Sequence, residues 1–173
     1  LVFSTLHTNS EVEAVSRIVA LLKEKDRRIV LGKSLVLLQA QRLVPRLCPA
    51  CRKERRPTEE EHAIFAKHMP QLQRVGAKEF STVFEPSVQG CSECRGGYSG
   101  RTVIMSLLPV SEKISEMVAK GRDTFDILEE AKKMGFLNLY EEALLKVQSG
   151  EISMAEAELW NDAWENFEIT NVS

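Results

Sequence analysis

The four cysteines constrain this chain of 173 residues more than any other feature. They form two Cys-x-x-Cys pairs, Cys48/Cys51 and Cys91/Cys94, with 39 residues between the pairs. Each pair stands in a stretch that contains proline or glycine and is typical of a tight turn. Such a turn lets two thiolates reach one ion, and two such turns complete the tetrahedral sulfur site that suits zinc. The sequence therefore predicts one zinc ion bound by all four cysteines.

Three other uses of the cysteines compete with zinc. Iron accepts the same four sulfur ligands. Two disulfides suit an oxidising compartment, whereas we expect this chain to be cytoplasmic. A redox-active Cys-x-x-Cys would leave the second pair without a role. Zinc is favoured, and we expect it to be structural, because four thiolates close the coordination sphere and leave no position for an activated water.

The charge balance excludes a generally basic nucleic-acid binder. The chain carries 23 lysines and arginines and 25 aspartates and glutamates, a formal net charge of -2. No aromatic side chain stands between the basic residues of 52–56 to stack on bases, so we expect no nucleic acid as a partner and a solvated surface for this run. No apolar run approaches the ~20 residues of a membrane helix, so we expect no transmembrane segment.

Apolar spacing, capping residues and prolines predict a mixture of short helices and extended segments. Pro45 and Pro70 are expected to end two of the helices. A capping box, Thr58 with Glu61, is expected to begin one of them. The predicted helices cover residues 11–24, 33–43, 59–68, 112–119, 124–134, 138–148 and 154–165, and the predicted extended segments cover residues 1–6, 78–85 and 102–105.

The sequence contains one partial match to a phosphate-binding loop, and this match fails. Gly32-Lys33-Ser34 has the last three residues of that motif, but the required first glycine would stand at position 27, which is Arg27. The apolar residues 29–31 between them cannot form a loop of amides around phosphates. No other segment of the sequence fits the motif.

His7 is the histidine whose position is most suggestive. It directly follows the predicted strand over residues 1–6 and is flanked by hydroxyl and amide side chains. Ligands of α/β folds bind at the carboxyl ends of strands, so His7 is a candidate ligand-binding residue. A histidine that only forms hydrogen bonds within a turn fits the same pattern, and the residues alone leave both interpretations open.

Several segments, taken in order, resemble one family: the hexameric secretion ATPases of type II secretion and type IV pilus assembly, the GspE/PilB type. The first nine residues are similar to that family's histidine box, and both cysteine turns match. The resemblance is colinear over about residues 1–160, which is more specific than any single motif. The matching segments are residues 1–9, 14–17, 40–44, 47–51, 90–94, 97–101 and 107–110, Gly135, and residues 150–153.

This resemblance implies an α+β chain with three parts. Residues 1–47 are expected to be the C-terminal part of a RecA-like ATPase core, residues 48–101 a tetracysteine zinc-binding module, and residues 102–173 a small helical domain. His7 is then the histidine-box residue that senses the γ-phosphate of ATP, and Arg17 is a second candidate on the nucleotide side. The complete protein is expected to use ATP and Mg²⁺, whereas this chain, which lacks the phosphate loop and the acidic boxes, is expected to be inactive alone.

The resemblance also implies partners and a location. We expect a homo-hexamer that contacts inner-membrane platform proteins of a secretion or pilus system, in the cytoplasm and peripherally associated with the inner membrane. Two positions depart from the family pattern: Ser106 stands where a glutamate is usual, and Pro45 stands in a stretch that is usually basic. The alternative is an independent zinc-binding adaptor that contacts protein or RNA. A chain that begins in mid-strand without methionine favours a piece of the motor.

Overall fold

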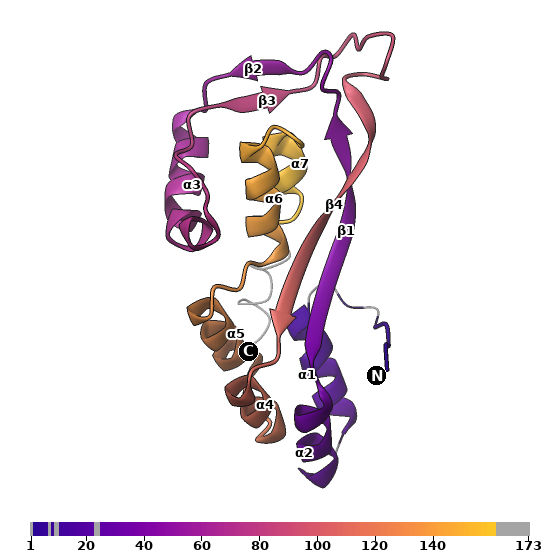
Figure 1. Cartoon of the computed structure of the whole chain (residues 1–173), viewed down its shortest axis with the longest axis vertical. Helices are drawn as coiled ribbons and strands as arrows, with labels where there is room; N and C mark the ends of the chain where they lie inside the picture. Colours follow the sequence, from indigo (N-terminus) through magenta and orange to yellow (C-terminus); the bar gives the residue numbers. More distant parts are fainter. Residues whose placement is uncertain (1, 7, 9–10, 23–24, 162–173) are drawn as a thin grey trace, which may run out of the picture. The chain divides into compact units, whose positions relative to one another are not determined.

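The computed structural model describes residues 2–6, 8, 11–22 and 25–161, and it mixes helices with strands (Figure 1). The chain divides into two compact units, and each unit combines two separate stretches of sequence. The first unit contains Leu1–Ala40 and Ser106–Phe136, and the second contains Gln41–Met105 and Leu137–Ser173. The expected α+β class is confirmed.

Two long strands, β1 (Leu37–Leu47) and β4 (Tyr98–Pro109), form a two-stranded sheet and run in opposite directions (Figure 1). The predicted helix over residues 33–43 is therefore wrong. Leu38 and Ala40 are buried and their neighbours in β1 are exposed, which is the two-residue period of a strand. The pairing of β1 with β4 outweighs the helical spacing of the leucines. The local spacing of residues does not reveal such a pairing.

The predicted strand at the start of the chain is also not observed. Residues 2–6 have no regular secondary structure, and the side chains of Val2 and Phe3 are almost fully exposed. A strand needs a neighbouring strand to satisfy its backbone hydrogen bonds. The two sheets found among the described residues do not include this segment.

The described part of the first unit contains four helices: α1 (Glu11–Leu21), α2 (Lys25–Ser34), α4 (Glu112–Ala119) and α5 (Thr124–Lys133). α2 contacts α4, and α5 contacts both α1 and α4. α2 was not predicted, because the charged residues of its first turn are typical of the solvated end of the preceding helix. Among the residues of α1, α4 and α5 whose side chains the structure describes, the buried ones are Val15, Ile114, Val118, Ile127, Leu128 and Ala131.

The contact between α2 and α4 depends on Gly32. A Cβ atom at this position would lie 2.6 Å from the backbone oxygen of Ser115. The Ser115 hydroxyl also donates a hydrogen bond of 2.7 Å to the Gly32 carbonyl oxygen. The absence of a side chain therefore lets the two helix backbones approach closely, although glycine is unfavourable inside a helix.

The second unit contains a short two-stranded sheet and a long helix. β2 (Lys53–Arg55) pairs antiparallel with β3 (Val83–Glu85), and Glu54 lies opposite Phe84 in the register. Between these strands run α3 (Glu59–Leu72) and the 3-10 turn η1 (Gln73–Val75).

α3 begins as predicted but ends later. Thr58 and Glu61 form the expected capping box. Pro70 does not end the helix, which continues to Leu72, although proline lacks an N–H and removes one hydrogen bond of the helical ladder. Phe65, buried on α3, stacks on Phe80 with ring centroids 3.4 Å apart. The segment between the cysteine pairs therefore has apolar packing of its own.

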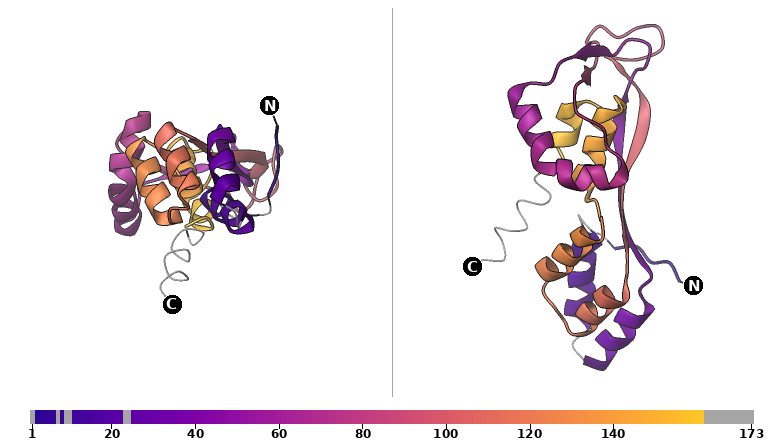
Figure 2. Two further views of the ribbon diagram at one scale, coloured as in Figure 1. Left: turned by 90° about the horizontal axis from the view of Figure 1, so that it is seen from below. Right: turned by 60° about the vertical axis from the view of Figure 1, so that its left-hand side comes forward.

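Two further helices complete the second unit, α6 (Leu139–Gln148) and α7 (Met154–Glu158). α6 contacts α3, β3 and α7, and α7 also contacts β3 (Figure 2). The side chain of Asn138 caps α6 and that of Ser153 caps α7. None of the helices among the described residues has the length and apolar character needed to cross a membrane.

We expect Gly32→Ala to lower the free energy of unfolding by about 1–3 kcal/mol, because the added methyl group would overlap the Ser115 carbonyl and force α2 and α4 apart. Chemical denaturation measures this difference. The matched control is Lys33→Ala, an exposed position on the same helix, which should change stability by no more than about 0.5 kcal/mol. A Gly32→Ala protein as stable as the control would contradict the close approach.

Candidate metal centre

The structure brings the four cysteines together. Their sulfur atoms all lie within 4.8 Å of one another, although 39 residues separate the two pairs. The Sγ–Sγ distance is 3.8 Å between Cys48 and Cys91, 3.5 Å between Cys51 and Cys94, and 3.6 Å between Cys91 and Cys94. Cys48 is fully buried and the other three are partly exposed.

The first cysteine turn follows β1 directly. The backbone N–H groups of Cys51 and Arg52 both donate hydrogen bonds to the Cys48 carbonyl oxygen, at 3.3 and 2.9 Å. These bonds close a tight turn that directs both thiols to the same side. The Cys48 N–H donates to the Gly97 carbonyl oxygen at 2.8 Å, which ties the first turn to the segment after the second.

The second cysteine turn depends on glycine. The Cys94 N–H donates to the Cys91 carbonyl oxygen at 3.2 Å, and the Cys91 N–H points at the Cys94 sulfur at 3.3 Å. Gly97 has φ 85°, and a Cβ atom there would lie 2.5 Å from the backbone nitrogen of Ser87. The glycine-dense sequence after Cys94 thus provides a conformation and a close approach that other residues resist.

The arrangement of the sulfurs fits a four-coordinate metal. Zinc–sulfur bonds of about 2.3 Å at tetrahedral angles place neighbouring sulfurs about 3.8 Å apart. The three observed distances, 3.5 to 3.8 Å, are close to this value. A disulfide would require about 2.05 Å, and all four cysteines are free. The four cysteines can therefore hold one metal ion.

The protonation of the cluster differs between cysteines. Desolvation, together with hydrogen bonds among the sulfurs, raises the pKa of Cys51 to about 12. Desolvation also acts to raise the pKa of Cys94, but hydrogen bonds from Cys51 and from the Cys91 N–H outweigh it and lower that pKa to about 7. Near neutral pH the cluster therefore carries thiolate character at Cys94, which attracts a cation.

Charged residues near the turns have specific partners, so the expectation of a solvated run over residues 52–56 is wrong in part. Both terminal nitrogens of Arg55 bind the Glu61 carboxylate, at 2.6 and 2.7 Å, and its Nε binds Glu85. The Arg55 hydrogen bonds lower the pKa of Glu61, which is buried. This ion pair joins α3 to the β2–β3 sheet. The charge pattern alone predicted solvent exposure, and only the fold selects these partners.

Of the other two predicted site residues, the structure describes only Arg17, which is not part of this cluster. His7 lies outside the described residues. Arg17 lies on α1, in the first unit, with an exposed side chain. Their predicted roles at a nucleotide remain predictions.

Comparison with known proteins identifies the family. The family described as Type II/IV secretion system protein matches residues 1–159. The Type IV pilus assembly ATPase PilB of Myxococcus xanthus is 34% identical over 157 residues, 90% of this chain and 26% of the relative. The Type II secretion system protein E of Klebsiella pneumoniae is 34% identical over 131 residues, 75% of this chain and 23% of the relative. The Protein transport protein HofB homolog of Escherichia coli is 31% identical over 157 residues, 90% of this chain and 30% of the relative.

The chain belongs to the Type II/IV secretion system protein family, because the family match spans nearly all of it. The family resemblance stated from the motifs is thereby confirmed. The chain spans between 23% and 30% of the length of these three relatives.

Two adjacent glycines allow a test of the second turn. Gly96 and Gly97 both have positive φ, 57° and 85°, but an added Cβ meets open space at Gly96 and the Ser87 backbone at Gly97. We expect Gly96→Ala to cost about 1–2 kcal/mol from backbone strain alone. Gly97→Ala should cost about 1–3 kcal/mol more, from overlap. Thermal unfolding of the two variants measures the difference, and equal melting temperatures would contradict the close approach at Gly97.

Proposed function

We propose that this chain is the C-terminal part of a cytoplasmic ATPase that powers type II secretion or type IV pilus assembly. The observation that carries the proposal is the family match over residues 1–159, together with relatives named as pilus assembly ATPases. In the complete protein, residues 1–47 continue a RecA-like core, residues 48–101 form the metal-binding module, and residues 102–173 supply the C-terminal helices. None of the comparisons supports the alternative of an independent zinc-binding adaptor.

The complete protein binds ATP and Mg²⁺ in this proposal and works as a homo-hexamer on platform proteins of the inner membrane, with which it associates peripherally. The 173 residues contain no phosphate-loop motif, so the chain alone hydrolyses no ATP. His7 contributes at the γ-phosphate, and Arg17 contributes on the nucleotide side.

The proposed role of the cysteines is to hold one structural zinc ion. The sulfur distances and the four free thiols support this choice over disulfides, and tetrahedral sulfur coordination suits zinc. Bound zinc would supply a cross-link between the two turns. Because α3 has its own packing through Phe65 and Phe80, the ion organises mainly the two cysteine turns and the β2–β3 sheet. It does not organise the whole segment between the cysteine pairs.

Elemental analysis of the purified chain should find about one zinc per molecule. Cys48→Ser, which removes the buried ligand, should lower the zinc content strongly and mimic treatment with a chelator. Zinc affinity should also fall as the pH falls, by at least about tenfold for each unit below pH 7, because protons compete for the thiolates.

Ser92→Ala is the matched control for the zinc measurement, because Ser92 is exposed between two ligands and its loss removes no sulfur. It should retain one zinc. A folded, metal-free wild-type chain, or a chain with iron in place of zinc, would contradict the proposed ion.

For the nucleotide site, we expect His7→Ala in the complete protein to lower ATP hydrolysis by ~10-fold or more, as removal of a positioned group at the transition state does. The melting temperature and hexamer formation should change little. His62→Ala, on the exposed side of α3, serves as the control and should keep normal turnover. Loss of folding in His7→Ala would instead indicate a structural histidine.

A further inference from the structure

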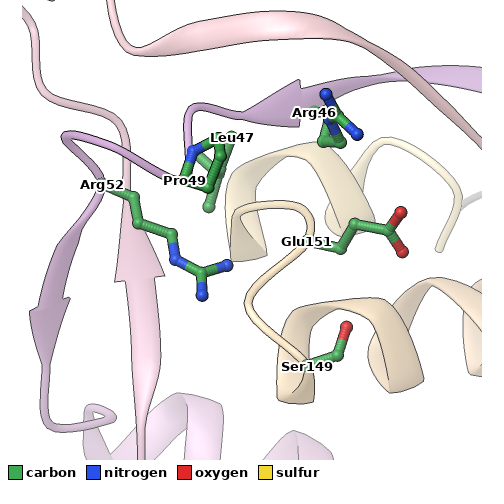
Figure 3. A pocket seen from close by; sticks show the side chains of 6 residues that line it. All are labelled: Arg46, Leu47, Pro49, Arg52, Ser149 and Glu151. Atoms are coloured by element: carbon green, nitrogen blue, oxygen red, sulfur yellow. The ribbon is translucent and has the colours of Figure 1, made fainter.

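The two residues that flank the first cysteine turn both bind the loop between α6 and α7. The Leu47 N–H, just before Cys48, donates a hydrogen bond of 2.9 Å to the Glu151 carbonyl oxygen. Arg52, just after Cys51, donates a hydrogen bond from Nη1 to the Gly150 carbonyl oxygen. Figure 3 shows the Arg52 side chain extending from its turn toward this loop. Consecutive carbonyl groups of the loop are thus held from both sides of the turn.

The Arg52 guanidinium occupies a place that the fold has shaped for it. It lies over the ring of Phe84 on β3, 4.3 Å from the centroid, a distance at which a cation and an aromatic ring attract each other. Gly150 has φ 72°, and a Cβ atom there would lie 2.5 Å from Phe84 and 2.8 Å from Arg52 Nη1. The loop therefore admits the guanidinium only because residue 150 is glycine.

The side chain of Glu151 anchors the same loop on its other side. Its carboxylate accepts a hydrogen bond of 2.7 Å from the Thr102 hydroxyl on β4 and pairs with Lys146 on α6. Desolvation acts to raise the pKa of Glu151, but these partners outweigh it and lower that pKa. The carboxylate is therefore ionised at neutral pH, and the loop is attached to α6 and β4 independently of the cysteine turn.

We propose that Arg52 is a positioning residue that couples the metal centre to the α6–α7 loop. The inference depends on the proposed metal binding. A metal held by Cys48 and Cys51 fixes the turn between them, and thereby fixes the backbone from which Arg52 reaches Gly150. When the metal is removed, the turn loses this restraint, and the hydrogen bond to Gly150 opens more often.

The coupling also connects the metal to an open pocket of about 370 Å³, because the turn and the loop together line this pocket (Figure 3). The shape of this pocket follows the state of the metal centre. Its lining residues are Arg46, Leu47, Pro49, Arg52, Ser149 and Glu151.

Hydrogen exchange of the 173-residue chain, followed by mass spectrometry with and without zinc, tests the coupling. In wild type, the amides of Glu151 and Ile152, which bind the Lys146 carbonyl, should exchange roughly 10-fold faster after zinc is removed. In Arg52→Met, these amides should exchange at the faster rate even with zinc bound, and zinc removal should add less than about a further 3-fold. Gly150→Ala, which crowds Arg52 and Phe84, should behave like Arg52→Met.

Arg95→Met is the matched control, because Arg95 follows Cys94 as Arg52 follows Cys51 and its side chain is exposed. It should keep the wild-type pattern. The zinc content of each sample separates the two proposals. A wild-type chain that binds one zinc but exchanges equally with and without it would overturn the coupling alone, as would an Arg52→Met protein that keeps the full zinc-dependent protection. A wild-type chain that binds no zinc would overturn both proposals.

Discussion

The convergence of four sulfur atoms within 4.8 Å is the constraint on which the end of the second unit that carries the cysteine turns depends. Like charges at such separations repel strongly in a partly desolvated site, so the cluster must keep most of its protons or bind a cation. The two turns that carry the sulfurs also anchor the end of β1, the β2–β3 sheet and the start of β4. A contact between two loops, rather than a large apolar core, therefore organises this end of the unit.

Features with a local physical cause could be predicted from the sequence. The spacing of Cys48, Cys51, Cys91 and Cys94 indicated their meeting, and the capping box of Thr58 and Glu61 indicated the start of α3. The capping box and each Cys-x-x-Cys turn depend on residues a few positions apart, whereas the meeting of the two turns was inferred from the coordination chemistry of a metal. The clustering of the sulfurs agrees with the predicted metal ligands, and the choice of zinc depends on coordination chemistry.

Features with a distant cause could not be predicted. The leucines around Leu38 fit a helical spacing, and only the pairing of β1 with β4 makes a strand of them. Arg52 belongs to a charged run that reads as solvated, and its partners, Phe84 and Gly150, lie far away in the sequence. Gly150 is compatible with a close approach of another side chain, but the sequence does not show that this side chain is Arg52.

Because each unit joins an early and a late stretch of the chain, neither can close during synthesis until its second stretch has left the ribosome. The first unit waits for α4 and α5, and the second waits for α6 and α7. Contacts between residues so far apart in sequence slow folding, since the loop between them must be ordered first. During this interval α3 lacks its contacts with α6, so the partly synthesised second unit is exposed to aggregation until residues 139–148 have emerged.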